Sequence, residues 1–567
     1  MHFIKSKNLF QFILLLSVAA AISACNTKGN SVNEPIGSVK DTVVVLPFEP
    51  LITDSTAIAN FTKQFPLFNY HSKDVNSFYE NRNYEFGWFD STGITQTATK
   101  FINLLNHLGD EGIHDTVIYI TDLNNAVNNL ITSENIYTGK NKLTEQIELL
   151  LTSEFFVYAQ KVWGGISETE SRELNWYVKR KTLSSTSLLD SILNGSSTAF
   201  TSFQPHYKQY ELLKTQLKFY KALEDSVSWD SLFLPMDKKF LEQGDSYPVI
   251  TLIKDRLYVL GDLETRDTTS FLDSITTIAV IKYQSRFGLT ADGHAGQKFF
   301  ETMNTPLSYR IAQIEINMER CRWIPTDLKG DFVIVNIPEF KAHVYSADTL
   351  SWDMQVIVGR TSTSTTIFND EIKYIVFSPY WYVPGSIIRN EIFPAIVKSP
   401  EYLNRNHMEL YDYSTRKTVD YNSIDISKYS AKTFPFGVRQ KPGAFNSLGW
   451  AKFIFPNAYD IYLHDTPTRN LFAETQRNFS HGCIRISEPQ KFAEFLLRND
   501  STWTKASIDS VMHGGKETKA ILEKPVPVMI VYFTSWVDET GKLNFRKDIY
   551  NHDSDMLEKH TPIVSIK

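Results

Sequence analysis

The chain has 567 residues, of which 42% are hydrophobic and 22% charged, a composition typical of globular proteins that bury real cores. At about 150 residues per domain, this length predicts about four compact units. The formal net charge of −6 carries no electrostatic footprint of a nucleic-acid binder, which would show a basic patch or stripe. We therefore expect no nucleic acid among its partners.

The first 24 residues have the pattern of an export signal. Two lysines precede an apolar run at 9–22 and a small-residue cleavage site, and the run is shorter than the roughly 20 residues of a spanning helix. The ending Ile-Ser-Ala-Cys resembles the lipobox of bacterial lipoproteins, which implies removal of residues 1–24 and a lipid on Cys25. That lipid would anchor the protein to a membrane of the cell envelope, facing the periplasm. The alternative is an ordinary signal peptide with an incidental cysteine.

The next two regions carry no catalytic constellation. Residues 25–55 mix polar residues with proline and glycine, which predicts a linker. From 56 to 245 apolar residues recur at helical spacing, as in Thr144–Trp163, and this pattern predicts a helical scaffold domain.

A compact helical module is predicted for residues 246–316. An amphipathic helix ends near Gly288, a turn follows at 292–293, and a second helix comes after it. The pattern Q-x-x-x-G-L-x-x-D-G-x-x-G in this stretch resembles the peptidoglycan-binding domain, a small three-helix module. Glycan binding and a purely structural spacer remain alternative roles.

Beyond residue 320 the pattern changes from helices to short strands with turns between them. These strands predict a β-rich catalytic domain over 320–550, with a closing hairpin around Asp538–Gly541 and a tail at 551–567. A polar, helix-prone stretch at 386–440 predicts an inserted capping element. The predicted fold class is multidomain α+β: a helical scaffold, a three-helix module and a β-rich catalytic domain with a capping subdomain.

Three cysteines are present, Cys25, Cys321 and Cys483. In an oxidising compartment paired cysteines usually form disulfides, and with Cys25 lipidated only Cys321 and Cys483 could pair. Cys321 lies in an apolar and aromatic segment, so we expect it to be buried. A lone thiol retained in such a compartment indicates a use, which makes Cys483 a candidate nucleophile.

The segment NFSHGCIRISEP surrounds this thiol. A free thiol has a pKa of about 8.5, so cysteine catalysis needs a base, a group that orients it and backbone donors for an oxyanion. His464 ends the strand-like run IYLHDTP, nineteen positions before Cys483, and is the candidate base. Gly482 permits a sharp turn, so that amides near Cys483 can point at a developing oxyanion.

Two neighbours of the thiol have two interpretations each. His481, Cys483 and Arg485 alternate along the chain, and in an extended segment they would project from one face. His481 is then either a second imidazole of the site or a structural partner for Ser480. Arg485 would either bind a substrate carboxylate or hold the loop against an acid.

Other site chemistries fit less well. A zinc site from His464, His481 and Cys483 has acceptable ligand types, but the His-x-Cys spacing is unusual and no fourth ligand is evident. Papain-like peptidases usually place the cysteine before the histidine and have different local signatures, although chain order alone excludes no triad. No glycine-rich phosphate loop is present, so we expect no metal, nucleotide or other cofactor.

The motif His464-Asp-Thr-Pro followed by Ser480-His-Gly-Cys483-Ile-Arg485 resembles the signature of the L,D-transpeptidase family. The better match is its larger form, with a scaffold, an embedded peptidoglycan-binding module and a capping subdomain. The stretches 439–449 and 526–553 are also similar to its catalytic domain. The family often has Asn where this chain has Arg485, and the larger members are similar in having Arg.

The resemblance implies a peptidoglycan L,D-transpeptidase. Cys483 would attack the amide carbonyl at the L-centre of meso-diaminopimelate in a tetrapeptide stem, releasing D-alanine and leaving a thioester. His464 would take the thiol proton, oriented by the backbone carbonyl of Asp465, and an amine of a second stem would then form a direct cross-link. The amides of Gly482 and Cys483 would hold the oxyanion, and His481 would line the site.

The resemblance also implies a substrate cleft and a class of inhibitor. Ser480, Arg485, Trp381, Tyr382 and Asn446 are the expected substrate-binding residues, although the aromatic ones could instead pack the lid onto the core. Carbapenem-type β-lactams would acylate the thiol. Two other functions stay open: an L,D-carboxypeptidase using the same thioester with water as acceptor, and a non-enzymatic wall-binding lipoprotein, against which the intact motif argues.

Overall fold

The structure is a computed structural model that describes residues 50–560 except 115–117, 133–139, 181–183, 196–206 and 326–327. The predicted signal peptide, Cys25 and most of the linker lie outside the described residues. Within those ranges, none of the helices combines the length and apolar character that crossing a bilayer requires.

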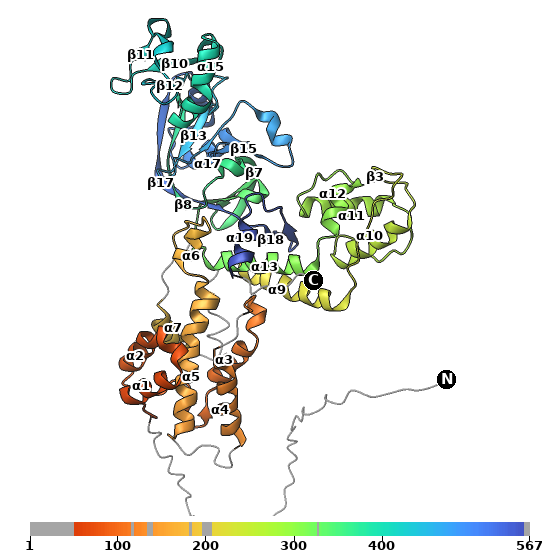
Figure 1. The fold of residues 1–567 in the computed structure, drawn as a ribbon, viewed down its shortest axis with the longest axis vertical. Helices are drawn as coiled ribbons and strands as arrows, with labels where there is room; N and C mark the ends of the chain where they lie inside the picture. The colour runs from red at the N-terminus through yellow and green to blue at the C-terminus, as the bar shows by residue number, and fades with distance from the viewer. Residues whose placement is uncertain are drawn as a thin grey trace, which may run out of the picture. The chain divides into compact units, whose positions relative to one another are not determined.

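The N-terminal part is helical and is organised around α5 (Lys142–Tyr158). A capping box at Asn141 starts this helix, and nearly all of its residues are buried, including Leu150 and Phe155. A helix that is buried on nearly every side has to be surrounded by other elements. The surrounding helices are α1 (Ser55–Gln64), α2 (Ser72–Asn81), α3 (Gln96–Asn106), α4 (Ile120–Thr132) and α7 (Ser185–Asn194) (Figure 1). The same region contains the short strand pair β1 (Phe89–Asp90) and β2 (Gly93–Ile94).

A second helical group follows. Its elements are α6 (Glu168–Glu173), α9 (Gln209–Ser226), α10 (Pro248–Val259), α11 (Ser274–Arg286), α12 (Gln297–Met303) and α13 (Leu307–Arg322), with the strand pair β3 (Phe240–Leu241) and β4 (Ala295–Gly296). Helix α13 packs on α9 and joins the C-terminal domain through Asn317, which exchanges hydrogen bonds with Thr534 at 2.8 and 3.0 Å. These buried amide contacts hold the helical and β-rich parts together locally.

The C-terminal domain is built on a nine-stranded sheet. Its strand order is β15-β7-β16-β14-β13-β8-β17-β5-β6, and β6 also pairs with β7, so eight of the strands form a closed ring that leaves no free edge. The strands are β5 (Phe332–Asn336), β6 (Lys341–Ser346), β7 (Thr349–Gly359), β8 (Asn369–Phe377), β13 (Ala451–Ile454), β14 (Leu463–His464), β15 (Asn478–Ser480), β16 (Ile484–Ile486) and β17 (Thr518–Val531).

Helices and a hairpin complete this domain: α17 (Pro489–Leu497), α18 (Lys505–His513), α19 (His552–His560), and the pair β18 (Ser535–Val537) and β19 (Leu543–Phe545). The predicted closing hairpin is confirmed, and Asp538 shapes its turn by accepting from the Thr540 amide at 2.9 Å. The fold class, helical toward the N-terminus and β-rich toward the C-terminus, is confirmed as well.

An inserted subdomain interrupts the sheet between β8 and β13. Its four-stranded sheet has the order β11-β10-β12-β9 and its own apolar core around Ile396, Leu410 and Val438. The elements are β9 (Trp381–Tyr382), α14 (Gly385–Ile387), the π-helix η6 (Ile388–Ile392), α15 (Phe393–Lys398), α16 (Tyr402–Arg405), β10 (Met408–Tyr411), β11 (Thr418–Val419) and β12 (Gly437–Gln440). A separate core lets this cap hold its shape independently of the ring.

Candidate active site

Strand pairing sets His464 beside two cations. β14 lies between β13 and β16, and His464 is the register partner of Lys452 on one side and of Arg485 on the other. Register partners lie side by side on one face of a sheet. Tyr462, two residues before His464, shares that face, and its ring centroid lies 5.7 Å from the imidazole.

Cys483 follows a turn between β15 and β16. The Ile484 amide donates to the Tyr462 carbonyl at 3.2 Å, so Cys483 stands level with Tyr462. Its Sγ lies 3.5 Å from the Asp460 carbonyl oxygen. Cys483 and His464 are thus offset by one inter-strand spacing across the sheet and by two residues along it. At the usual spacings this offset places their Cα atoms roughly 8 Å apart. Of the two residues that the sequence paired, His464 lies on β14 and Cys483 immediately precedes the neighbouring strand β16.

The His464 ring is fixed in one tautomer. Its Nδ1–H donates to the Asp465 carbonyl oxygen at 2.6 Å, because a carbonyl can only accept, and this leaves the Nε2 lone pair to act as a base. The side chain is 5% exposed. Burial first, and then the positive charge of Arg485, lower the pKa of His464 to about 3 against the contribution of the Asp465 carbonyl. The imidazole is neutral at physiological pH.

The carboxylate of Asp465 serves a different purpose from its carbonyl. Its Oδ2 accepts from the Trp450 amide at 2.9 Å, and its Oδ1 lies 3.3 Å from an Arg469 nitrogen. Burial raises the pKa of this carboxyl. The acid therefore holds the loop after β14 in place, and only the backbone orients the imidazole.

Cys483 and Cys321 are both free thiols, and Cys321 is fully buried, as expected from the sequence. Burial raises the pKa of the Cys483 thiol above its ordinary value, and hydrogen bonds from Tyr462 oppose part of that rise. A neutral thiol beside a neutral imidazole is the resting state. Because the thiol is not ionised before the attack, catalysis needs its proton to be transferred to His464 during the attack.

Ser480 and Gly482 have roles other than those the sequence predicted. The buried Ser480 hydroxyl donates to the Cys483 carbonyl at 2.6 Å and accepts from the Gly482 amide at 3.1 Å, so it lines no cleft. Because the Gly482 amide is engaged, it is not a free oxyanion donor. The Cys483 amide has no hydrogen-bond partner among the described residues and is the remaining candidate. The sequence alone does not show to which groups the Ser480 hydroxyl hydrogen-bonds.

The turn itself requires a glycine. Gly482 has a φ of +121°, and a Cβ there would lie 3.9 Å from the carbonyl oxygens of Thr363 and Ser364. Thr365 adds a hydrogen bond from its hydroxyl to the Gly482 carbonyl at 2.8 Å. The positive φ, which side chains rarely adopt, fixes the direction in which Cys483 leaves the turn.

The expectation that His481, Cys483 and Arg485 share one face is wrong, because residues 481–483 form a bend where an extended strand was assumed. His481 Nε2 lies 2.9 Å from a carboxylate oxygen of Glu391 on the capping subdomain. Arg485 instead donates to the Thr468 hydroxyl at 3.3 Å and remains beside the thiol. His481 therefore joins the nucleophile turn to the cap.

The contacts of Asn446 favour a structural role over its predicted role in substrate binding. Its side chain is buried, its Nδ2 donates to the Pro379 and Lys441 carbonyls at 2.9 Å each, and its Oδ1 accepts from the Leu448 amide at 2.8 Å. Both polar atoms of the buried amide thus have partners inside the fold. Sequence spacing did not reveal this saturation.

Trp381 and Tyr382 form β9 at the edge of the cap sheet, opposite Gln440 and Arg439. Trp381 packs against the apolar core of the cap. The Tyr382 ring lies 5.5 Å from that of Tyr411. The contacts of both aromatic residues favour the packing alternative.

Two residues near the base were not predicted. Tyr462 stands level with Cys483, since its carbonyl accepts from the Ile484 amide, and its position two residues before His464 was a usable signal. The sequence around Lys452 carried no signal of its position beside His464, because the register between β13 and β14 is set by the folded sheet. Lys452 is half-buried, and burial lowers the pKa of its ammonium group.

The lowered pKa of His464 predicts an unusual pH profile. An imidazole of ordinary pKa near 6.5 would be mostly protonated at pH 5 and would lose its base function. His464, with a pKa of about 3, stays neutral there. We expect the rate of D-alanine release from a tetrapeptide to change less than about threefold between pH 7.5 and 5. A tenfold fall centred near pH 6.5 would show that His464 titrates normally.

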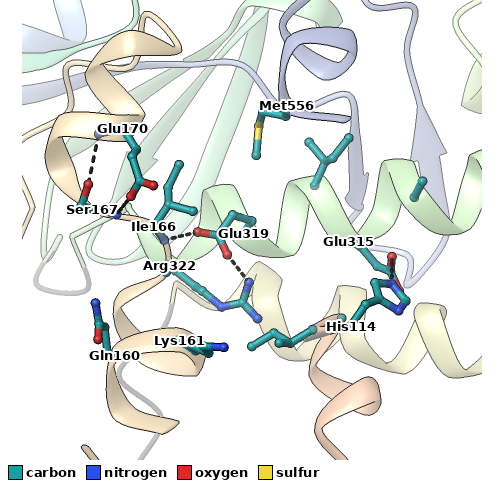
Figure 2. A pocket seen from close by; sticks show the side chains of 15 residues that line it. His114, Gln160, Lys161, Ile166, Ser167, Glu170, Glu315, Glu319, Arg322 and Met556 are labelled. Carbon is teal, nitrogen blue, oxygen red and sulfur yellow. Dashed lines mark hydrogen bonds and ion pairs between the residues drawn. The ribbon is translucent and has the colours of Figure 1, made fainter. Parts of the chain in front are cut away.

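A separate cavity of about 360 Å³ lies where the N-terminal helices meet α13 (Figure 2). Its walls carry the pairs His114–Glu315 at 2.7 Å and Arg322–Glu319 at 2.5 Å. Arg322 also donates to the Val162 carbonyl at 2.8 Å. The cavity contains none of the predicted site residues, and these contacts join the helices. In the described part of the chain, no group of three His, Cys, Asp or Glu side chains is arranged to hold a metal ion.

Three family models match the chain. Residues 330–516 match the "L,D-transpeptidase catalytic domain", residues 73–217 the "Scaffold domain" and residues 246–303 the "Putative peptidoglycan binding domain". A curated protein of Haemophilus influenzae described as "Putative L,D-transpeptidase" is 34% identical over 241 residues, which is 42% of this chain and 48% of the relative. The chain thus spans about half the length of the curated relative it matches.

Solved structures give a weaker likeness. An L,D-transpeptidase from Xylanimonas cellulosilytica is 12% identical and covers 53% of this chain and 100% of its own, with a TM-score of 0.18. L,D-transpeptidase 1 of Mycobacterium tuberculosis is 13% identical, covering 36% and 61%, with a TM-score of 0.14. Such scores add nothing to the family match. On the three models, the chain carries a catalytic domain of the L,D-transpeptidase family together with a scaffold domain and a peptidoglycan-binding domain.

Proposed function

We propose that this protein is a peptidoglycan L,D-transpeptidase that joins two diaminopimelate residues directly. The observation that carries the proposal is the pairing of β14 with β16 inside the matched catalytic domain, because the oriented, neutral His464 lies on β14 and Cys483 immediately precedes β16. A nucleophile, a base and a backbone group that orients the base are the parts that acyl transfer through a thioester needs.

In the first step Sγ of Cys483 attacks the carbonyl at the L-centre of meso-diaminopimelate, and Nε2 of His464 takes the thiol proton. The Cys483 amide donates to the oxyanion. Burial, and then the positive charges of Arg485 and Lys452, make the resulting imidazolium a strong acid, because each of them disfavours its charge. The imidazolium therefore gives the proton readily to the leaving amine of D-alanine, and the thioester remains.

In the second step an amine of a neighbouring stem attacks the thioester. His464 is neutral again and accepts a proton from that amine, and the thiolate leaves and is reprotonated. The new amide is the cross-link. Arg485 contributes a partly buried guanidinium beside the thiol, which suits a carboxylate of the stem.

Location and inhibition belong to the same proposal. A lipid on Cys25 would hold the protein at a membrane facing the periplasm, within reach of the wall. Carbapenem-type β-lactams would acylate Cys483, because a thiol with a general base opens a strained amide in the same way as it opens the stem amide.

Product analysis tests the proposal. We expect the purified protein, given tetrapeptide stems, to release D-alanine and to produce cross-linked dimers in excess of trimmed tripeptides, as measured by mass spectrometry. Dimers require the amine to compete with water for the thioester. Tripeptides alone would identify an L,D-carboxypeptidase, and unchanged tetrapeptide would leave a wall-binding protein without activity.

A further inference from the structure

A cavity of about 760 Å³ lies between the peptidoglycan-binding module and the segment that leads to the nucleophile. One wall consists of β3, which precedes the module and pairs with its strand β4, together with the turn after α11 and the start of α12. The catalytic domain contributes residues from Glu474 to Phe479. The hydroxyls of Thr290 and Thr475 join the two walls by a hydrogen bond of 2.8 Å. The volume is within the range of ligand sites, roughly 300–1,000 Å³.

The positive and negative side chains that line this cavity balance each other. Lys239 and Lys298 are matched by Asp292 and Glu474, and all four are exposed. Such a lining neither attracts a polyanion nor selects a cation. It suits an uncharged, polar polymer.

An aromatic platform forms where β3 pairs with the module. Phe240 is 37% exposed, and its ring centroid lies 4.5 Å from that of His294 with a 32° tilt. The backbone of Phe240 pairs with Gly296 in the β3–β4 ladder, so the ring is held at the surface. The flat apolar face of a sugar ring packs well on such a platform.

Two residues with amide side chains line the catalytic wall of the same cavity. Gln476 is exposed, and its side chain makes no hydrogen bond within the described part of the chain. Asn478 is half-buried beside it. Amides supply both donors and acceptors, which is what the hydroxyl and acetamido groups of aminosugars require.

The catalytic wall is rigid and close to the thiol. Buried Arg477 donates to the Val356 and Phe340 carbonyls at 3.2 and 3.0 Å, and this fixes the segment on the sheet. Phe479, which lines the cavity, precedes Cys483 by four residues, so the two are at most about 14 Å apart along the chain. Three extended residues of a stem peptide span about 10 Å, which is comparable to that distance.

We infer that this groove binds the glycan strand of peptidoglycan between the two domains, so that a stem attached to the bound strand reaches Cys483. The inference rests on the proposed function, since it names the part of that substrate which the groove holds. It assigns the sugar faces to Phe240 and His294, and polar contacts to Gln476 and Asn478.

Binding of glycan strands freed of their stem peptides tests the groove without using catalysis. In the full chain, Phe240→Ala is expected to weaken this binding about tenfold, as for a central aromatic contact, and Gln476→Ala roughly two- to tenfold, as for one hydrogen bond. Phe271→Ala is the matched control, because Phe271 is an exposed phenylalanine of the same region outside the groove. It should leave binding unchanged.

Turnover separates the groove from the proposed function. Phe240→Ala should raise the KM for intact peptidoglycan about tenfold and leave the turnover of a free tetrapeptide within twofold. Equal binding by wild type and both groove variants would overturn the inference, and so would a loss confined to Phe240→Ala. A wild-type chain that binds glycan through both walls but releases no D-alanine would retain the groove and reject the proposed function.

Discussion

Cys483→Ser is expected to abolish D-alanine release and cross-link formation, with a loss of roughly 10⁴-fold or more, as for removal of other catalytic nucleophiles. The hydroxyl is close in size to the thiol and would occupy the same turn, which Gly482 and Ser480 determine. Its proton is far less acidic than that of a thiol. His464, with a pKa of about 3, is too weak a base to compensate.

The measurement is the rate of D-alanine release by the folded variant, with carbapenem adducts followed by intact mass. Cys321→Ala is the control, because Cys321 is the other free thiol of the described chain and is fully buried. That variant should lose about 1 kcal/mol of stability at most and keep both turnover and the adduct. Turnover in Cys483→Ser above one tenth of the wild-type rate would contradict a thioester mechanism.

Residues whose partners are near in the chain could be predicted from the sequence. Asp465 is adjacent to His464, so the backbone carbonyl that accepts from Nδ1 is available in almost any turn at that place. The hairpin at Asp538–Gly541 depends on a local Asp turn. The candidate nucleophile followed from cysteine count and compartment, which are also independent of tertiary structure.

Residues whose partners come from distant segments could not be predicted. The Asn446 amide is saturated by carbonyls that include Pro379, 67 positions away. His481 contacts Glu391 in the cap, 90 positions away. Lys452 faces His464 only because of the register between β13 and β14. Strand register and loop direction are properties of the assembled sheet. A sequence motif specifies only residue types, so it could not predict these contacts.

His464→Ala is expected to lower the rate of acylation by about 10²–10⁴-fold, the usual contribution of a well-placed general base. The resting thiol is protonated, since burial raises the pKa of Cys483, so the attack depends on a group that takes its proton. The loss should appear in the release of D-alanine and in the rate of carbapenem acylation alike, because both begin with the same transfer.

His481→Ala is the matched comparison, an imidazole two positions from the thiol that contacts Glu391 on the cap. If His464 is the base, His481→Ala should change acylation less than about tenfold and keep the flat pH profile between 5 and 7.5. A smaller effect for His464→Ala than for His481→Ala would transfer the base role to His481.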